Sequence, residues 1–333
     1  GLHPVNLVNR VLSSWKQDNL LRKIVRNSSY LFIGNTLSTI VQSILSARLL
    51  GILGFGILGV VVEFATNINR LLSFRMGELV VKYVGQFLVE NRKDRAAAIF
   101  KASIFLETFS SLLAYLLLLL LAPLAASLIV KDTNAADLIT FYALALLANF
   151  ATESSTGFLQ VTDRFRSQAF IGFLQSLLTA ALVIYAYIIH GSIQLVLGAY
   201  LAGKVFNGLA LAGYAFWRAR RTLGPGWWRA SLKLLPPARE FWGFAWSTNL
   251  SGTITMVTRD SESVWLSMLL GPFAAGVYKT AKAVINLVTL PITPFITAAY
   301  PAINQAVAEK AWPRLRDLLK KLTWISALWT GGV

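Results

Sequence analysis

Cysteine is absent from the 333 residues, which excludes disulfides, thiolate nucleophiles and cysteine-ligated zinc within them. Histidine occurs only twice, at His3 and His190, so neither a histidine triad nor a histidine-based metal site is expected. Charged side chains make up 14% of the chain, against about 25% in an ordinary soluble domain. We therefore expect no metal, no cofactor and no catalytic residues, and a surface that faces something other than water.

Long hydrophobic runs separate the few charges, and 56% of the residues are hydrophobic. A membrane-spanning helix needs about 20 mostly apolar residues. The stretches that meet this requirement are 29–50, 55–80, 99–122, 136–158, 169–189, 193–216, 241–262 and 272–300. A further apolar stretch begins near Leu322 and stops at Val333, so we expect a chain truncated inside it. The sequence predicts an all-α polytopic membrane protein.

The net charge of +16 comes from 31 Lys and Arg against 15 Asp and Glu. Most of the basic residues fall in the N-terminal segment and in every second connection between the expected spans. Lys and Arg accumulate on the cytoplasmic side of inner-membrane proteins. The positive net charge is therefore explained without nucleic-acid binding, and no nucleic-acid partner is expected. We expect a multi-pass protein of the inner (plasma) membrane with a cytoplasmic N-terminus.

The segment 217–239, WRARRTLGPGWWRASLKLLPPAR, mixes Trp with Arg and contains Pro-Gly and Pro-Pro. It is expected to be a cytoplasmic linker on the membrane surface, with Trp at the interface and Arg facing anionic lipid. The expected organisation is a cytoplasmic segment 1–28, a first lobe of six helices 29–216, the linker, and a second lobe that starts in 240–333 with two helices and part of a third. Membrane lipids are expected partners.

An internal repeat supports the two lobes. ARLLGILGFGILG, from Ala47, aligns without a gap on SMLLGPFAAGVYK, from Ser267, at an offset of 220 residues. Leu-Leu-Gly recurs, and Gly56 falls on Gly276. Six spans precede the linker, so we expect two six-helix lobes related as parallel repeats, with the second lobe truncated in this chain. Transporters built from such repeats handle substrate between the halves near the membrane midplane.

Residues 54–59, GFGILG, have the Gly-x-Gly-x-x-Gly spacing of a dinucleotide-binding loop. Such a loop follows a short strand inside a soluble βαβ unit. The run from Tyr30 to Leu50 is too long for a strand and is expected to span the membrane. We interpret the glycines as a tight turn and as the close-packed start of the next helix.

The two glycine-containing segments carry a family resemblance. ARLLGILGFGILG resembles the first-to-second helix turn of the polysaccharide-export flippases, and LLGPFAAGVYKTAKAV, followed by Pro291, Pro294 and Pro301, resembles their seventh and eighth helices. These flippases belong to the multidrug/oligosaccharidyl-lipid/polysaccharide exporter superfamily, which also contains drug-extrusion (MATE) and peptidoglycan-lipid branches. The resemblance implies alternating access and transfer of a polyprenyl-diphosphate-linked oligosaccharide from the inner to the outer leaflet, for cell-surface polysaccharide or lipopolysaccharide biosynthesis.

Ionisable residues inside membrane spans are costly and by default mark function. The candidates for binding the diphosphate headgroup in a central cavity are Asn67, Arg70, Lys204, Arg259, Lys279, Lys282 and Asn286. Arg offers phosphate bidentate hydrogen bonds and Lys a point charge. The candidates for coupling transport to a proton or sodium gradient are Glu63, Glu153 and Asp260. The alternative is that these groups form buried ion pairs that hold helices together, and for Glu63 both interpretations stay open.

Three functions compete on this sequence. The leading hypothesis is a flippase for lipid-linked oligosaccharide, with glycan-assembly enzymes as candidate partners. A cation-coupled multidrug antiporter of the same architecture is expected to have an acidic and aromatic pocket, whereas these candidates are basic on balance. A membrane-embedded glycan polymerase or ligase needs a substantial outer loop, and the outer connections expected here are about 5–15 residues long.

Overall fold

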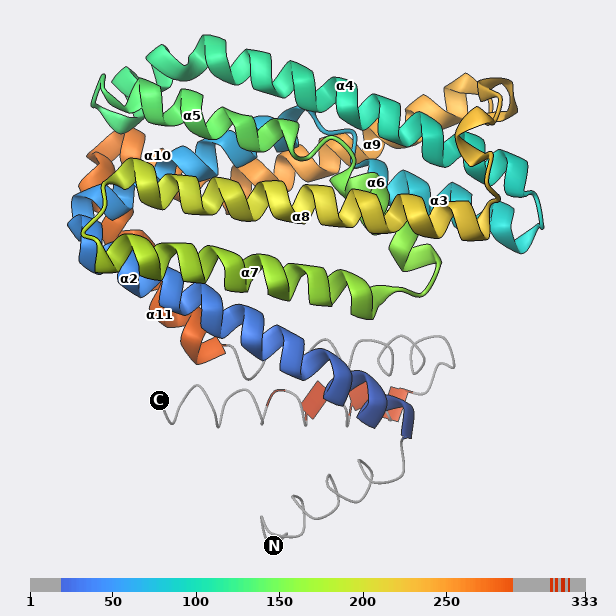
Figure 1. Ribbon diagram of the computed structural model, residues 1–333, viewed down its shortest axis with the longest axis horizontal. Coiled ribbons are helices and arrows are strands. Elements are labelled where there is room, and N and C mark those ends of the chain that lie inside the picture. The colour runs from blue at the N-terminus through green and yellow to red at the C-terminus, as the bar shows by residue number, and fades with distance from the viewer. Residues whose placement is uncertain (1–18, 290–311, 314, 317–318, 321–322, 324–333) are drawn as a thin grey trace, which may run out of the picture. The chain divides into compact units, whose positions relative to one another are not determined.

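The computed structural model describes residues 19–289 together with 312–313, 315–316, 319–320 and 323. These residues form helices and connecting turns, and no strand occurs among them (Figure 1). Five of the described helical segments are long and apolar enough to cross a membrane. The all-helical, multi-span architecture predicted from the sequence is confirmed.

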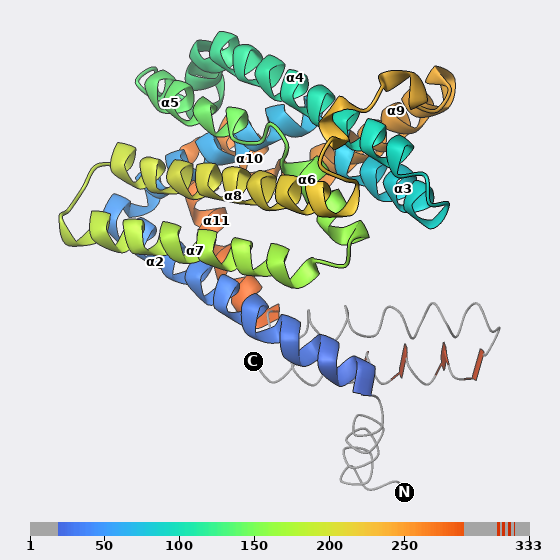
Figure 2. The ribbon, with the colours of Figure 1, turned by 45° about the vertical axis from the view of Figure 1, so that its right-hand side comes forward.

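The chain divides into two compact units, one of residues 41–281 and the other of residues 1–40 with 282–333. In chain order the α-helices are α2 (Asn19–Leu72), α3 (Met76–Val89), α4 (Lys93–Ala125), α5 (Ala135–Leu147), α6 (Thr152–Val161), α7 (Phe165–Ile188), α8 (Ile193–Thr222), α9 (Ala238–Thr255), α10 (Glu262–Leu270) and α11 (Pro272–Thr289). Short 3₁₀ or π segments are η1 (Ala126–Val130), η2 (Trp227–Arg229), η3 (Leu232–Leu234) and η4 (Met256–Asp260). Within the larger unit α4, α5, α8 and α7 run alongside one another in both ribbon views (Figures 1 and 2).

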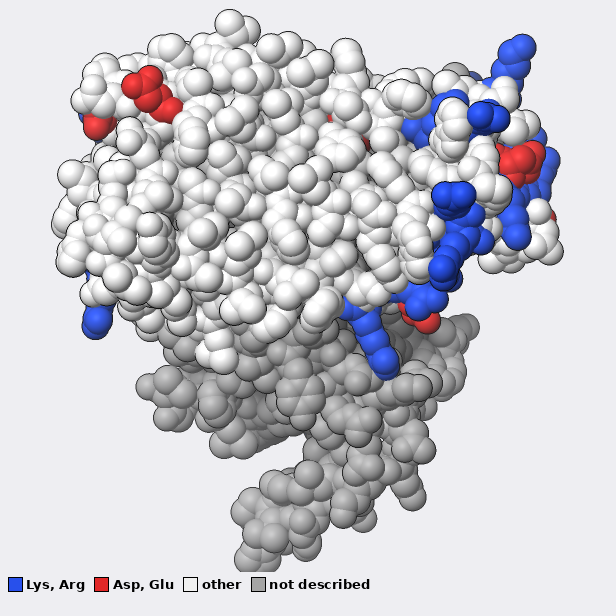
Figure 3. Space-filling model, viewed as in Figure 1, with Lys and Arg blue, Asp and Glu red and all other residues white. Residues whose placement is uncertain are grey.

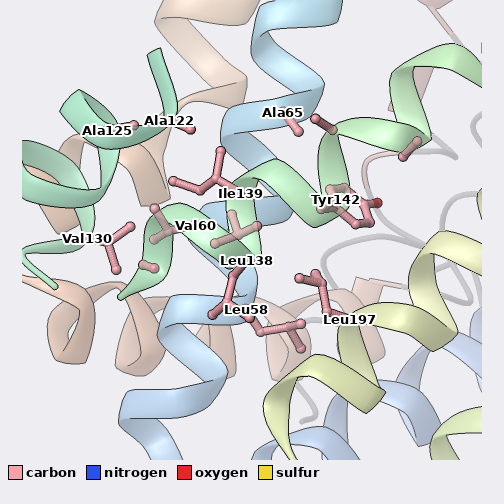
Figure 4. Packing of buried hydrophobic residues seen from close by; sticks show 14 of the residues in the cluster. Leu58, Val60, Ala65, Ala122, Ala125, Val130, Leu138, Ile139, Tyr142 and Leu197 are labelled. Atoms are coloured by element: carbon pink, nitrogen blue, oxygen red, sulfur yellow. The ribbon is translucent and has the colours of Figure 1, made fainter. Parts of the chain in front are cut away.

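Small and branched apolar side chains, together with buried aromatic rings, fill the core between these helices, and many other large apolar side chains face outward. Figure 4 shows one cluster, in which the labelled side chains are Leu58, Val60, Ala65, Ala122, Ala125, Val130, Leu138, Ile139, Tyr142 and Leu197. Alanine at such positions lets helix backbones approach closely, as is usual between membrane helices. On α4 the outward positions are taken by Phe105, Phe109 and Leu120, which are 61%, 65% and 78% exposed.

Surface charge gathers at the ends of these helices (Figure 3), while a few charged side chains such as Glu107 and Lys204 lie between the ends. Figure 3 shows Lys and Arg gathered at the end where α4 begins and α8 ends, beside a broad face without charged atoms. The apolar outward side chains cover that face, which matches what a lipid bilayer requires of a spanning segment. The local reason is the sequence itself, since many of the basic residues lie in the first turns of α4 and the last turns of α8.

The predicted repeat is visible in the backbone. Gly51 has φ 68° and ψ 175°, and Gly271, its equivalent at an offset of 220, has φ 96° and ψ 167°. Both lie in a region open to glycine alone, so the chain bends in the same way after Leu50 and after Leu270. GFGILG therefore follows a bend between two helical segments, and no strand precedes it.

Close contact between the repeats is reciprocal. A Cβ on Gly56 would overlap the carbonyl oxygen of Pro272, and a Cβ on Gly276 would overlap that of Ile52. Ile52 and Pro272 are themselves separated by 220 residues, so each repeat offers the other the same backbone surface. Such an exchange of equivalent contacts is what an approximate two-fold relation produces. The parallel-repeat prediction thus has a physical counterpart at this crossing.

Two of the expected spans are interrupted, which the sequence did not predict. The span expected at 55–80 breaks at 73–75, between α2 and α3, and the span expected at 136–158 breaks at 148–151, between α5 and α6. Arg75 at the first break has φ 49°, a left-handed conformation that is uncommon for a residue with a side chain. Neither break contains proline or glycine; side chains on other helices satisfy freed backbone groups instead.

Candidate functional site

A cavity of about 230 Å³ lies inside the first lobe, beside both helix breaks. Helices α2, α4, α5, α6 and α8 all contribute to its wall. Its uncharged polar lining includes Thr66, Asn69, Ser110, Ser111, Asn149 and Thr152. A space of this size holds several water molecules, because one water takes about 30 Å³ in the liquid. Charged groups at its wall can therefore stay solvated within the membrane.

Two cations meet at this cavity. Arg70 comes from the last turn of α2 and Lys204 from the middle of α8, and they lie within electrostatic reach of each other. Two like charges at one cavity favour a ligand that carries more than one negative charge. An arginine beside a lysine suits a diphosphate, because the guanidinium forms paired hydrogen bonds and the ammonium adds a point charge.

Glu107 of α4 is buried at the break between α5 and α6, where it is 4% exposed. Its Oε1 accepts from the backbone N–H of Glu153 at 2.6 Å, and its Oε2 accepts from that of Ser154 at 2.9 Å. These two N–H groups belong to the first turn of α6 and have no partner within that helix. A carboxylate on another helix thus caps α6, and the positive end of the helix dipole stabilises its charge.

Glu153, in the same first turn of α6, makes a second connection. Both of its carboxylate oxygens accept from the Ser73 hydroxyl, at 2.8 and 2.9 Å, and the Ser73 oxygen accepts from the N–H of Arg75 at 3.1 Å. The carboxylate also reaches the backbone N–H of Met76, where α3 begins. Glu153 therefore joins the two breaks, and the cavity wall holds two carboxylates besides its two cations.

Comparison with known proteins shows which family this chain belongs to and which proteins it is similar to. The sequence profile of a family described as polysaccharide biosynthesis protein matches residues 24–307. The chain belongs to this family. Inner membrane protein YghQ of Escherichia coli (strain K12) is 27% identical over 298 residues, which are 88% of this chain and 83% of that protein.

Solved structures with the same fold are MOP superfamily transporters. A multidrug resistance MATE family transporter in an inward-facing conformation superposes with a TM-score of 0.66 and 17% identity, over 92% of this chain and 71% of that one. A MOP superfamily transporter from Pyrococcus furiosus is described as having a binding pocket of reverse polarity. It superposes with a TM-score of 0.64 and 18% identity, over 93% of this chain and 70% of that one. This member of the polysaccharide biosynthesis family is thus a multi-pass membrane protein with the fold of MOP superfamily transporters.

The polar stripe predicted on the second span of this family member is divided between two places. Glu63 accepts from the N–H of Ser263 at 3.1 Å, at the start of α10, and Asn67 donates to the Ser261 hydroxyl oxygen at 3.2 Å. Both side chains hold the segment 261–263 against α2. Arg70, three residues further on, lines the cavity instead. Among the predicted binding residues, the structure brings Arg70 and Lys204 together, with the predicted coupling residue Glu153.

Lys279 lies against the repeat-related part of α2. Its ammonium is 5.0 Å from the centre of the Phe55 ring, and its side chain passes over Gly59, its own equivalent at an offset of 220. It is within electrostatic reach of Glu63. Lys279 and Glu63 thus share one region of the crossing between α2 and α11, away from the cavity that Arg70 lines.

For four further predicted residues, the structure gives no position relative to the cavity. The side chains of Arg259, Asp260 and Asn286 lie outside the described residues. Lys282 and Asn286 belong to the smaller unit, whose position relative to the cavity is outside what the structure describes. All four remain predictions.

Several site residues were not among the predicted ones. Glu107 stands alone in the apolar run ASIFLETFSSLLAYLLLL, and an isolated acid in such a run is a signal that the sequence does carry. Ser73 and Asn149 carry no such signal, because serine and asparagine are common in membrane helices and neither residue is charged. Only the meeting of two broken helices gives Ser73 its partner and places Asn149 at the cavity.

Proposed function

We propose that this transporter moves a polyprenyl-diphosphate-linked oligosaccharide from the inner to the outer leaflet by alternating access. The observation that carries the proposal is the meeting of Arg70 and Lys204 at a polar-lined cavity between the helices of the first lobe. A diphosphate headgroup needs such cations in place of water, whereas its polyprenyl tail can remain in lipid. Membership of the polysaccharide biosynthesis family supports the same substrate class. Glycan-assembly enzymes are the expected partners.

We further propose that transport is driven by a proton or sodium gradient acting on the carboxylates of this cavity. Glu153 and Glu107 lie within electrostatic reach of each other, so neutralising one by a cation relieves repulsion on the other. Their hydrogen-bond donors are hydroxyl and backbone N–H groups, and Arg75 lies within electrostatic reach of Glu153. The basic connections are proposed to face the cytoplasm, together with the N-terminus.

The test is translocation of a lipid-linked oligosaccharide in vesicles that contain the full-length protein. Arg70→Gln and Lys204→Gln are each expected to lower the rate about tenfold or more, the equivalent of losing one charge-assisted hydrogen bond of about 1.5–3 kcal/mol. Lys131→Gln is the matched control, since Lys131 lies in a short turn between η1 and α5 away from the cavity. Unchanged rates in both variants would disprove the site, and a wild-type protein without translocation would disprove the substrate.

A drug antiporter is the second candidate, because the superposed structures include MATE transporters. The cavity argues against an organic cation as substrate, since Arg70 and Lys204 repel it and both carboxylates already have donors. Efflux of a cationic dye from cells that express the protein distinguishes the two. Dye efflux that survives Arg70→Gln and Lys204→Gln would favour the antiporter.

A further inference from the structure

The first helix of the second lobe, α9, contacts the first break through Asn249. Its Nδ2 donates to the carbonyl oxygen of Leu71 at 3.3 Å and also to that of Ser73. Where a helix ends, the last carbonyls have no partner within it, so this side chain satisfies groups that the break leaves free. Phe74 packs edge-on against Trp242 and Trp246 of α9, with ring centres 5.9 and 5.6 Å apart. Helix α9 therefore contacts the backbone and the side chains of the broken segment.

Ser73 belongs to both contacts. Its carbonyl accepts from Asn249, and its hydroxyl donates to the carboxylate of Glu153. Two consecutive hydrogen-bonded links thus lead from a carboxylate at the cavity wall to the first helix of the other lobe. No helix turn or apolar packing separates them, so a change at Glu153 reaches α9 through one residue.

Glu153 is also positioned between two spaces. Besides the 230 Å³ cavity it lines a second one of about 500 Å³ that runs along α3 and α6. The second cavity includes Lys82 and Gln160, further along these helices toward the connections at 90–92 and 162–164. The first includes Thr66 and Ser110, on the opposite side of the breaks. Water can therefore approach Glu153 from either side of the breaks.

We propose that Ser73 and Asn249 are positioning residues that report the protonation of Glu153 to α9, so that α9 is held while Glu153 is charged and released when it is neutral. The proposal rests on the transport function proposed above. A hydrogen bond to a carboxylate is about twice as strong as one to a neutral acceptor. Protonation therefore weakens the hold on the Ser73 hydroxyl, and the carbonyl that Asn249 binds loses its fixed orientation.

Other charged groups near Glu153 influence how readily its carboxylate is protonated. On α3, Arg75 opposes protonation, and it is itself paired with Glu78 at 2.8 Å. Glu78 of α3 and Glu107 of α4 favour protonation by repulsion. The cations Arg70 of α2 and Lys204 of α8 line the same cavity as Glu153. On α9, Glu240 accepts instead from the Tyr83 hydroxyl at 3.0 Å, at the start of the helix.

The test measures the distance between α3 and α9 in the full-length protein in lipid vesicles. Spin labels are attached to cysteines introduced at Val89 and Ile254, which are 88% and 56% exposed. The 333 residues contain no native cysteine, so background labelling arises only from cysteines elsewhere in the full-length protein, which are replaced first. The wild-type distance is expected to lengthen between pH 8.5 and pH 5.5. Glu153→Gln is expected to show the long distance at both pH values.

Asn249→Ala and Ser73→Ala are expected to abolish the pH-dependent change. Thr248→Ala is the matched control: it is the neighbouring residue, and its hydroxyl donates only to carbonyls of its own helix, those of Phe244 and Ala245. It should keep the wild-type change. We call the hydrogen-bonded connection from Glu153 through Ser73 to Asn249 the relay. The relay is disproved if the pH-dependent change in distance persists in Asn249→Ala, or if the distance responds to sodium but not to pH.

Failure of the relay and failure of the proposed function give different results. Distances that respond to pH in a protein that translocates no lipid-linked oligosaccharide would support the relay and disprove the substrate. Translocation in a protein whose distances ignore pH would disprove the relay and leave the substrate proposal standing.

Discussion

Glu107 shows how a single buried acid can serve structure and chemistry together. Its two oxygens accept from consecutive N–H groups of α6, and it is 4% exposed. An ordinary helix start is capped by a neighbouring residue in the chain, but α6 is capped from a residue 46 positions earlier. The acid therefore fixes the distance between α4 and α6 as well as the charge of the cavity.

Glu107→Leu is expected to destabilise the protein, because two buried N–H groups lose their acceptors at about 1–3 kcal/mol each. Glu107→Gln keeps one acceptor oxygen and should cost about half as much. Thermal unfolding of the purified protein in detergent measures both. Ser127→Ala is the control, since its hydroxyl bonds only to Leu124 nearby in the chain and is expected to have little effect. A Glu107→Leu protein as stable as wild type would contradict the capping role.

The elements of this protein are organised by places where helices bend, break or cross. Gly51 and Gly271 bend two repeat-related segments alike, and Gly56 and Gly276 let α2 and α11 meet at backbone distance. The breaks at 73–75 and 148–151 expose backbone groups that only other helices can satisfy. Sequence patterns predicted the bends, because glycine marks them, but not the breaks.

Gly56→Ala is expected to lower stability by about 1–3 kcal/mol, because its Cβ has no room beside the carbonyl of Pro272. Gly172→Ala on α7 is a matched control, since nothing lies within 4 Å of the added carbon. Alanine favours a helix over glycine by about 1 kcal/mol, so the control should be neutral or stabilising. Equal effects of the two substitutions on the unfolding temperature would argue against a close crossing.

At the scale of the whole molecule, the distribution of charge decides how the protein sits in a membrane. Lys and Arg gather at one end of the described helices, and the face beside them carries no charge (Figure 3). Basic connections are retained on the cytoplasmic side during insertion. The proposed orientation rests on this bias and is independent of which substrate the cavity binds.

Single cysteines report that orientation directly. Val89→Cys, at the end where the basic connections lie, is expected to react with a membrane-impermeant maleimide only after the cells are opened. Ser192→Cys, at the opposite end between α7 and α8, is expected to react in intact cells. The cysteine-free 333 residues are the control background. The reverse labelling pattern would invert the proposed topology and the direction of transport.

Hydropathy, the basic connections and the repeated Leu-Leu-Gly were sufficient to predict an all-helical membrane protein with repeated lobes, because each is a local property of the chain. They also identified Arg70, Lys204 and Glu153 as costly groups inside spans. Which of these share a cavity is a matter of packing: Glu63 and Asn67 lie on the same stripe as Arg70 yet contact the segment 261–263. The roles of Ser73, Glu107 and Asn249 arise only in the folded chain. Their hydrogen-bond partners are carboxylates and backbone groups from distant segments, which become available when two helices break side by side.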